Sequence, residues 1–206
     1  MAAGLCPAAA FCAGLGTTLD RARFPAELLI VQGDLQRLTF SDRLSSDERL
    51  GLEGRIGSAL GGLEWLALEH EALSQSTVSR DALQGLQESW SARDLSSALE
   101  WVSGLTWDHA LNARIFSPER ATPDDVQRVR EIDARLCQGC HVDSVGTEKR
   151  LPAYRLQKMG KMISAGEFLA RLLSGVRGTA DTALANPLSL GDIRGFMKFY
   201  RESPAD

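Results

Sequence analysis

Apolar and polar positions along this chain repeat at the spacing of α-helices almost from end to end. Leu and Ala dominate the apolar positions, whereas strand-like alternation and runs of β-branched residues are scarce. The pattern therefore predicts an all-α protein. It breaks clearly at "IFSPERATPDD", where Pro118 and Pro123 interrupt any continuous helix. We place a domain boundary there, with one helical region over 20–117 and a second over 118–206.

Several helix starts are predicted before this boundary. Pro25 suits the first turn of a helix whose apolar positions are Leu28, Leu29, Val31, Leu35 and Leu38. Ser45 begins a second helix, because it can cap the first turn while Glu48, three residues later, reaches back. Ser79 and Ser91 are two further N-caps. These starts predict a helical bundle over 20–117.

The role of this bundle is not apparent from its sequence. All the tryptophans lie in it, and they are predicted to anchor its core: Trp65, Trp90, Trp101 and Trp107. His70 stands between Glu69 and Glu71, which predicts a solvated helix face. Nothing in 20–117 has the spacing of a catalytic motif.

After the boundary, the segment Thr122-Pro123-Asp124-Asp125 has the features of a helix start. Thr is the N-cap, Pro occupies the first helical position, and the acids face the positive helix end. This helix runs directly into "RLCQGCHVD". Cys137, Cys140 and His141 thus fall within five consecutive positions of a chain that has four cysteines and three histidines.

Three kinds of chemistry use such a cluster. A zinc site needs about four ligands, and this stretch supplies three, with no second CxxC or HxxxH downstream. A thioredoxin-like redox pair would follow a strand, whereas this CxxC ends a predicted helix. Covalent haem attachment fits better. Two thiols spaced in this way form thioethers to the haem vinyl groups, and the next residue becomes the proximal iron ligand.

Residues 122–206 resemble the small bacterial monohaem cytochromes c of class I. The resemblance consists of a helix ending in CxxCH, a proline about ten residues later (Pro152), the helix "AGEFLARLLSGVRG", and a final "LSLGDIRGFMKFYRES". It implies that one haem c is held by Cys137, Cys140 and His141, and that the Pro152 carbonyl accepts a hydrogen bond from the ligand imidazole. It also implies that the last helix, capped by Ser189 and Asp192, packs an aromatic face across the first.

The sequence departs from this family at the sixth iron ligand. Family members usually supply a methionine from the loop before the last helix, but "TADTALANPLS" contains no methionine or histidine. The remaining candidates are Met159, Met162 and His109, or an open position. This ligand decides between electron transfer, which needs a closed iron, and the binding of a small molecule.

Two functional hypotheses follow. The first is a periplasmic one-electron carrier that meets redox partner proteins, because thioether attachment takes place outside the cytoplasm in the bacterial systems that the resemblance implies. The second is a haem-based sensor or small-ligand binder with an open or weakly filled distal site. An enzyme such as a peroxidase would need a distal base or a second haem, and the chain has a single CxxCH. The oligomeric state is left open.

Composition argues against two further classes, nucleic-acid-binding and membrane-spanning proteins. The chain has 206 residues, 44% hydrophobic and 24% charged, with a net charge of −4, and it has no basic stripe with interleaved aromatics that would indicate nucleic-acid binding. No apolar run reaches the ~20 residues of a membrane span. The apolar, small-residue segment 1–19 is interpreted as the remnant of an export signal, or as disordered. Cys6 and Cys12 would then carry no chemistry, although a disulfide is an alternative.

Overall fold

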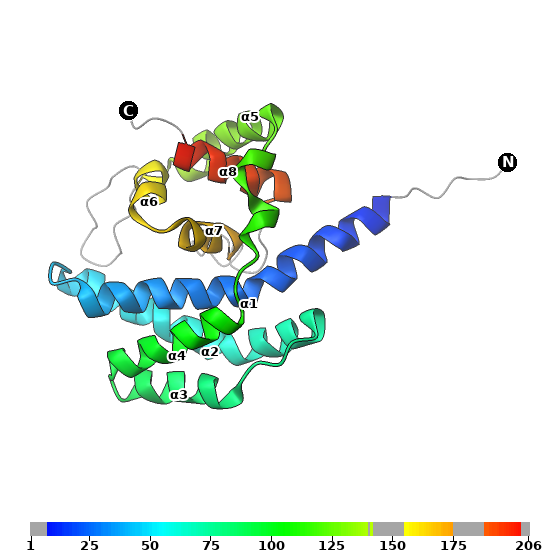
Figure 1. Cartoon of the computed structure of the whole chain (residues 1–206). Helices are drawn as coiled ribbons and strands as arrows, with labels where there is room; N and C mark the ends of the chain where they lie inside the picture. The colour runs from blue at the N-terminus through cyan, green and yellow to red at the C-terminus, as the bar shows by residue number, and fades with distance from the viewer. Residues whose placement is uncertain (1–7, 140, 142–154, 175–187, 203–206) are drawn as a thin grey trace.

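The computed structural model describes residues 8–139, 141, 155–174 and 188–202. These residues form helices joined by turns, and none of them lies in a strand, so the predicted all-α class is confirmed. Figure 1 shows two layers of helices, with the long first helix between them. The Cys140 and Pro152 positions fall outside the described residues, and the roles predicted for them stay predictions.

Four helices precede the boundary. They are α1 (Ala8–Phe40), α2 (Ser46–Ser74), α3 (Arg80–Ser91) and α4 (Leu95–Asp108). The predicted capping box at the start of α2 is present, because the Ser45 hydroxyl accepts from the Glu48 backbone N–H and the Glu48 carboxylate accepts from that of Ser45. The N-cap of α4 is Asp94, which accepts from Ser97 N–H, so the prediction of Ser91 was wrong.

The predicted start of the first helix at Pro25 was also wrong. Helix α1 begins at Ala8 and continues through Pro25. A proline inside a helix removes one hydrogen bond and leaves the carbonyl four residues earlier, that of Arg21, without its helical donor. The imidazole of His70 hydrogen-bonds this carbonyl instead. Figure 1 shows that α1 is bent along its length, as an internal proline would produce.

The first apolar cluster fills the space between α1, α2, α3 and α4. Its fully buried members include Leu28, Leu35, Ile56, Leu63 and Leu86. The expected Trp anchors contribute little to it. Trp90 packs partly against the cluster, but Trp65, Trp101 and Trp107 expose 57%, 42% and 85% of their surface. Smaller aliphatic side chains fill this core, and the large indoles lie around its edge.

The remaining elements form the second layer. They are two short 3₁₀ turns, η1 (Ala113–Phe116) and η2 (Pro118–Arg120), then α5 (Pro123–Ile132), the π-helical turn η3 (Asp133–Cys137), α6 (Leu156–Met162), α7 (Ala165–Leu173) and α8 (Leu190–Glu202). Their apolar side chains form the second apolar cluster, which includes Phe116, Phe168, Phe196, Ile193 and Tyr200.

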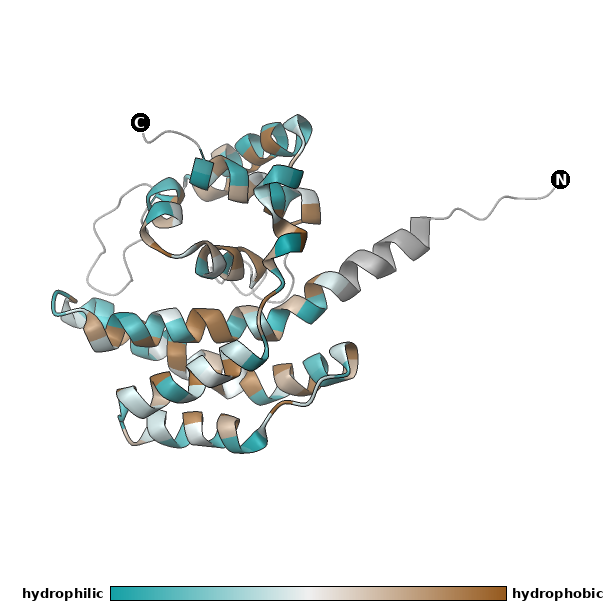
Figure 2. Ribbon diagram, viewed as in Figure 1, coloured by the Kyte–Doolittle hydropathy of each residue, from teal (hydrophilic) through white to brown (hydrophobic). Residues whose placement is uncertain are grey.

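Helix α1 belongs to both clusters. Phe24, Leu28 and Val31 are in the first, whereas Ala22, Ala26 and Ile30 are in the second. The two sets alternate along α1 and so lie on different sides of the helix. Figure 2 shows that hydrophobic and hydrophilic residues are interspersed along the described part of α1. Helix α1, which precedes the predicted boundary at 118, therefore also contributes to the core of the residues after it.

Buried charges also join the two layers. Asp34 of α1 accepts hydrogen bonds from Arg37, from Arg55 of α2 and from Arg171 of α7, each at 2.6 Å to its Oδ1. Glu167 of α7 pairs with the same Arg37 and Arg171. The Glu167 carboxylate lies where a Cβ on residue 33 would stand, only 2.5 Å away, so Gly33 is required to admit it.

None of the described helices is both long enough and apolar enough to span a membrane.

Candidate functional site

The helix that leads to the CxxCH stretch is specified locally, as predicted. The Thr122 hydroxyl accepts from the Asp125 backbone N–H at 3.1 Å, and the Asp125 carboxylate accepts from that of Thr122 at 2.8 Å. Pro123 occupies the first helical position of α5. The helix then directs Val129 and Ile132 into the second apolar cluster. This packing fixes where the chain leaves α5.

A π-helical turn, Asp133–Cys137, joins α5 to the CxxCH stretch and includes its first cysteine. The Gln138 N–H donates to the Asp133 carbonyl at 3.0 Å, five residues back, and the His141 N–H donates to the Cys137 carbonyl at 3.0 Å, four residues back. Residues four apart on a helical turn face the same side. The second bond places Cys137 and His141 one helical turn apart, and both residues are half-buried.

The Cys137 side chain packs against the second apolar cluster. Beside it lies Tyr200, which is fully buried and whose ring stacks on that of Phe196 with centroids 5.4 Å apart and meets that of Phe168 edge-on at 5.9 Å. Burial raises the pKa of Tyr200, and a hydrogen bond to Asp133 and the proximity of Cys137 raise it further. The aromatic ring of Tyr200, with its hydroxyl bonded to the Asp133 carboxylate, therefore lies beside the cysteine.

The last helix packs across α5, the helix that leads to the CxxCH stretch, as predicted. The Ser189 hydroxyl accepts from the Asp192 N–H at 3.1 Å, which confirms the predicted cap of α8. Gly195 lies against α5 so closely that a Cβ there would be 2.8 Å from the Asp125 carbonyl oxygen and from Val129 Cγ2. The backbones of α5 and α8 therefore meet at Gly195, a contact the sequence pattern did not single out.

Of the three residues proposed as a sixth ligand, Met159 alone packs against the second apolar cluster, which also contains Cys137. Met162 is 62% exposed. His109 contacts Phe24 and His70, in the layer of the first cluster, with ring centroids 5.4 and 5.3 Å away. The suggestion that His109 folds over the CxxCH stretch is therefore not supported by its contacts.

The expectation that His70 lies on a solvated face was wrong. His70 and His109 are each only 8% exposed, and their rings meet edge-on. Burial lowers the pKa of both imidazoles, and the neighbouring His109 lowers that of His70 further. The sequence held one signal for this site. A proline within a helix leaves the Arg21 carbonyl in need of a donor, and His70 supplies it.

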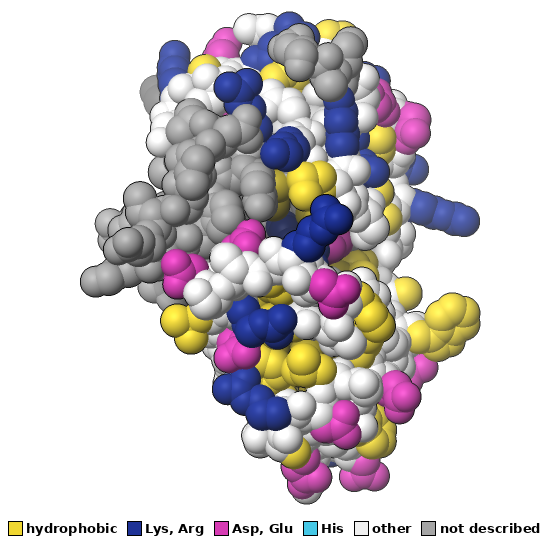
Figure 3. Space-filling model, turned by 90° about the vertical axis from the view of Figure 1, so that its left-hand side faces the viewer, with side chains coloured by type: hydrophobic (Ala, Val, Ile, Leu, Met, Phe, Trp, Pro, Cys, Tyr) yellow, Lys and Arg dark blue, Asp and Glu magenta, His cyan; other side chains and the backbone are white. Residues whose placement is uncertain are grey.

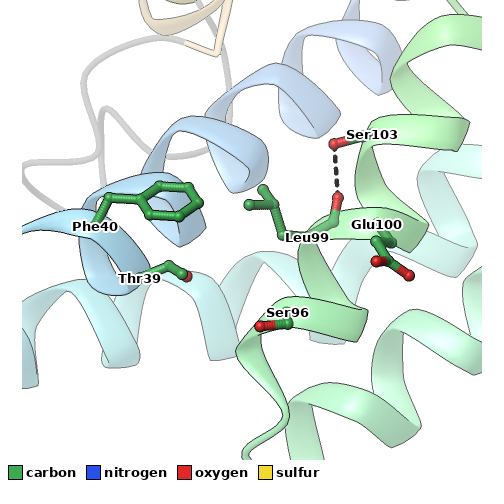
Figure 4. Close-up of a pocket in the computed structure, with 6 residues that line it drawn as sticks. All are labelled: Thr39, Phe40, Ser96, Leu99, Glu100 and Ser103. Atoms are coloured by element: carbon green, nitrogen blue, oxygen red, sulfur yellow. Dashed lines mark hydrogen bonds between the residues drawn. The ribbon is translucent and has the colours of Figure 1, made fainter.

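A pocket of about 500 Å³ lies elsewhere, between the end of α1 and α4 (Figure 4). Its lining contains the apolar side chains Phe40 and Leu99, one carboxylate (Glu100) and three hydroxyls. The Ser103 hydroxyl donates to the Leu99 carbonyl at 2.6 Å. The lining offers no thiol and no imidazole, and it belongs to the layer opposite Cys137.

Among the described residues, no group of three or more His, Cys, Asp or Glu side chains is arranged to hold a metal ion. No protein-family model, curated protein or solved structure matches this chain. The CxxCH stretch and its surroundings are therefore the candidate functional site.

Proposed function

We propose that this protein is a monohaem c-type cytochrome that carries one electron between redox partner proteins in the periplasm. The observation that carries the proposal is the placement of Cys137 and His141. A backbone hydrogen bond joins them one helical turn apart after α5, and Cys137 packs against the second apolar cluster beside Tyr200. Covalent haem requires this combination of a thiol and an imidazole beside an apolar surface.

The residues present fit such a group. Cys137 and Cys140 would hold the porphyrin through thioethers, His141 would hold the iron, and Pro152 would orient the imidazole. When bound, the haem supplies a one-electron couple. The chain would cover part of the porphyrin with the second apolar cluster and so exclude water. Packing of α8 on α5 supports the resemblance to class I cytochromes c, because the last helix of that family packs across the first.

Surface charge is consistent with a docking role near this site. The side of the molecule that carries α6 has mainly Lys and Arg side chains over its upper part and more Asp and Glu toward α3 and α4 (Figure 3). Lys158 and Lys161 of α6 are both exposed. These lysines favour an acidic partner protein, since complementary charge accelerates encounter.

The first test is the pigment of the protein matured in an export-competent bacterial host. We expect a haem that acidified acetone does not extract and a pyridine spectrum typical of two thioethers. The Cys137→Ala/Cys140→Ala variant should lose this haem, whereas Cys6→Ser/Cys12→Ser should retain it. A colourless wild-type protein would refute the proposal.

A second candidate function, a haem-based sensor or small-ligand binder, is favoured by one observation. Two of the three candidate sixth ligands, Met162 and His109, do not lie in the second apolar cluster. Carbon monoxide separates the functions, because an open ferrous iron binds it at once and a methionine-ligated iron does not. If Met159 closes the iron, Met159→Ala should convert a protein that excludes carbon monoxide into one that binds it. Binding by the wild type would favour the sensor.

A further inference from the structure

A buried carboxylate lies directly behind Cys137. Asp133, the first residue of the π-helical turn, is only 4% exposed. Its Oδ2 accepts from Gln138 Nε2 at 2.9 Å, and its Oδ1 accepts from the Tyr200 hydroxyl. In the described part of the chain, both hydrogen bonds that Asp133 accepts therefore come from neutral groups. They stabilise the negative charge without cancelling it.

The direction of the Tyr200 hydrogen bond is fixed by its surroundings. Burial and the neighbouring Asp133 raise the pKa of Tyr200, so the phenol keeps its proton at physiological pH and donates it to the carboxylate. The same hydroxyl lies near the Cys137 sulfur, which contributes to the rise. The carboxylate, the hydroxyl and the sulfur are therefore close together on one side of the α5–α8 contact.

We propose that the buried negative charge of Asp133 lowers the reduction potential of a haem attached at Cys137. The inference rests on the proposed function and deepens it by naming a residue that sets the potential. Oxidised haem carries one more positive charge than reduced haem, so a nearby anion stabilises the oxidised form. The effect is strong where the effective dielectric constant is ~20 and weak where water raises it to ~80. Because Asp133 is buried, we expect its charge to affect the potential more than the charge of a surface carboxylate does.

The test compares reduction potentials of purified holoproteins by spectroelectrochemical titration. Asp133→Asn keeps the size of the side chain and removes its charge. We expect the ratio of reduced to oxidised haem at a fixed applied potential to rise about tenfold, which is ~59 mV for one electron. The matched control is Glu131→Gln, which removes the same charge from an exposed position two residues earlier. It should change the ratio less than twofold.

A second variant keeps the test decisive if Asp133→Asn does not fold. Gln138 is exposed, so a lysine there is tolerated and places a positive charge beside the Asp133 carboxylate. Gln138→Lys should shift the potential in the same direction. Gln127→Lys, exposed on α5, adds the same charge away from Asp133 and should leave the potential nearly unchanged.

The two proposals fail in different ways. A wild-type protein without haem would refute the proposed function and remove the basis of this inference. A haem-containing protein whose potential is the same in wild type, Asp133→Asn and Gln138→Lys would overturn the inference and leave the proposed function standing. Thermal melts of the same samples show whether a shifted potential accompanies loss of structure. A shift in potential that appears only in variants with a lowered melting temperature would also contradict the proposal that the charge of Asp133 lowers the potential.

Discussion

At the scale of single residues, polar groups buried beside an irregularity of a helix are the main finding. His70 hydrogen-bonds the Arg21 carbonyl that Pro25 leaves without a helical donor, and Asp133 accepts two hydrogen bonds at a π-helical turn. His70 compensates for the hydrogen bond that Pro25 removes from α1, whereas Asp133 pairs with two side chains, those of Gln138 and Tyr200. His70 Nδ1 is itself buried without a hydrogen-bond partner in the described part of the chain. Protonation of this atom would create a buried positive charge beside His109.

The His70–His109 pair predicts a loss of stability in weak acid. Burial lowers the pKa of both imidazoles below that of an unfolded histidine, about 6.5. Above that pH these two histidines are neutral in both the folded and the unfolded state, so their titration does not change the free energy of unfolding. As the pH falls below about 6.5, the unfolded chain takes up protons first, so the free energy of unfolding decreases until the pH passes below the folded pKa values.

Urea unfolding followed by circular dichroism at pH 7.5 and pH 5.5 measures this effect. His70→Gln keeps a donor for the Arg21 carbonyl, and His109→Phe keeps an aromatic ring beside Phe24, so the double variant retains the packing without the titration. We expect its midpoint to change less between the two pH values than that of the wild type. Equal changes in both proteins would contradict the assignment.

At the scale of elements, helix starts were predictable wherever the signal is local. The capping residues at the starts of α2, α3, α5 and α8 were identified from the sequence, because a cap involves side chains within three residues. The start of α1 was not predictable from local signals. Helix α1 continues through Pro25 because His70, 45 positions later, hydrogen-bonds the carbonyl that the proline leaves without a donor. The Asp94 cap was missed because Ser91 is an equally good capping residue by type, and the helix before it simply continues to Ser91.

The α5–α8 contact predicts opposite effects for two glycine substitutions. Gly195→Ala would place a Cβ 2.8 Å from Asp125 and Val129 atoms, so the helices must separate, and we expect a loss of about 1–3 kcal/mol in unfolding free energy. Gly61→Ala in α2 is the control, since nothing lies within 4 Å of its Cβ. It should stabilise by about 0.5–1 kcal/mol, because alanine favours the helix. Denaturant melts distinguish the two, and a neutral Gly195→Ala would show that α5 and α8 are not closely packed.

At the scale of the whole molecule, α1 is the element that both layers share. It contributes apolar side chains to each cluster, and its Asp34 joins α2 and α7 through three arginines. Burial alone would raise the pKa of Asp34, but the hydrogen bonds and charges of Arg55, Arg171 and Arg37 outweigh it and hold this pKa below its usual value. The ionised carboxylate is therefore part of the contact between the layers.

Removal of that charge should loosen both layers. Asp34→Asn leaves three arginines around a neutral group, and we expect a loss of about 3 kcal/mol in unfolding free energy. Glu53→Gln breaks the more exposed pair with Arg93, 3.1 Å apart, and should cost less than about 1 kcal/mol. Chemical denaturation of the two variants provides the comparison. Similar losses for both would show that the Asp34 network does not stabilise the contact.

The sequence by itself determined the helical class, most helix starts and the CxxCH stretch with its leading helix, because these depend on periodicity and on residues close in the chain. The tertiary structure decided which side chains became buried. It placed His70 against His109 and left three tryptophans at the surface. It also brought Tyr200 to Asp133 and Cys137, and Arg171 to Asp34. These pairs of residues are 39 to 137 positions apart in sequence, and only the packing of helices against one another determines that they meet.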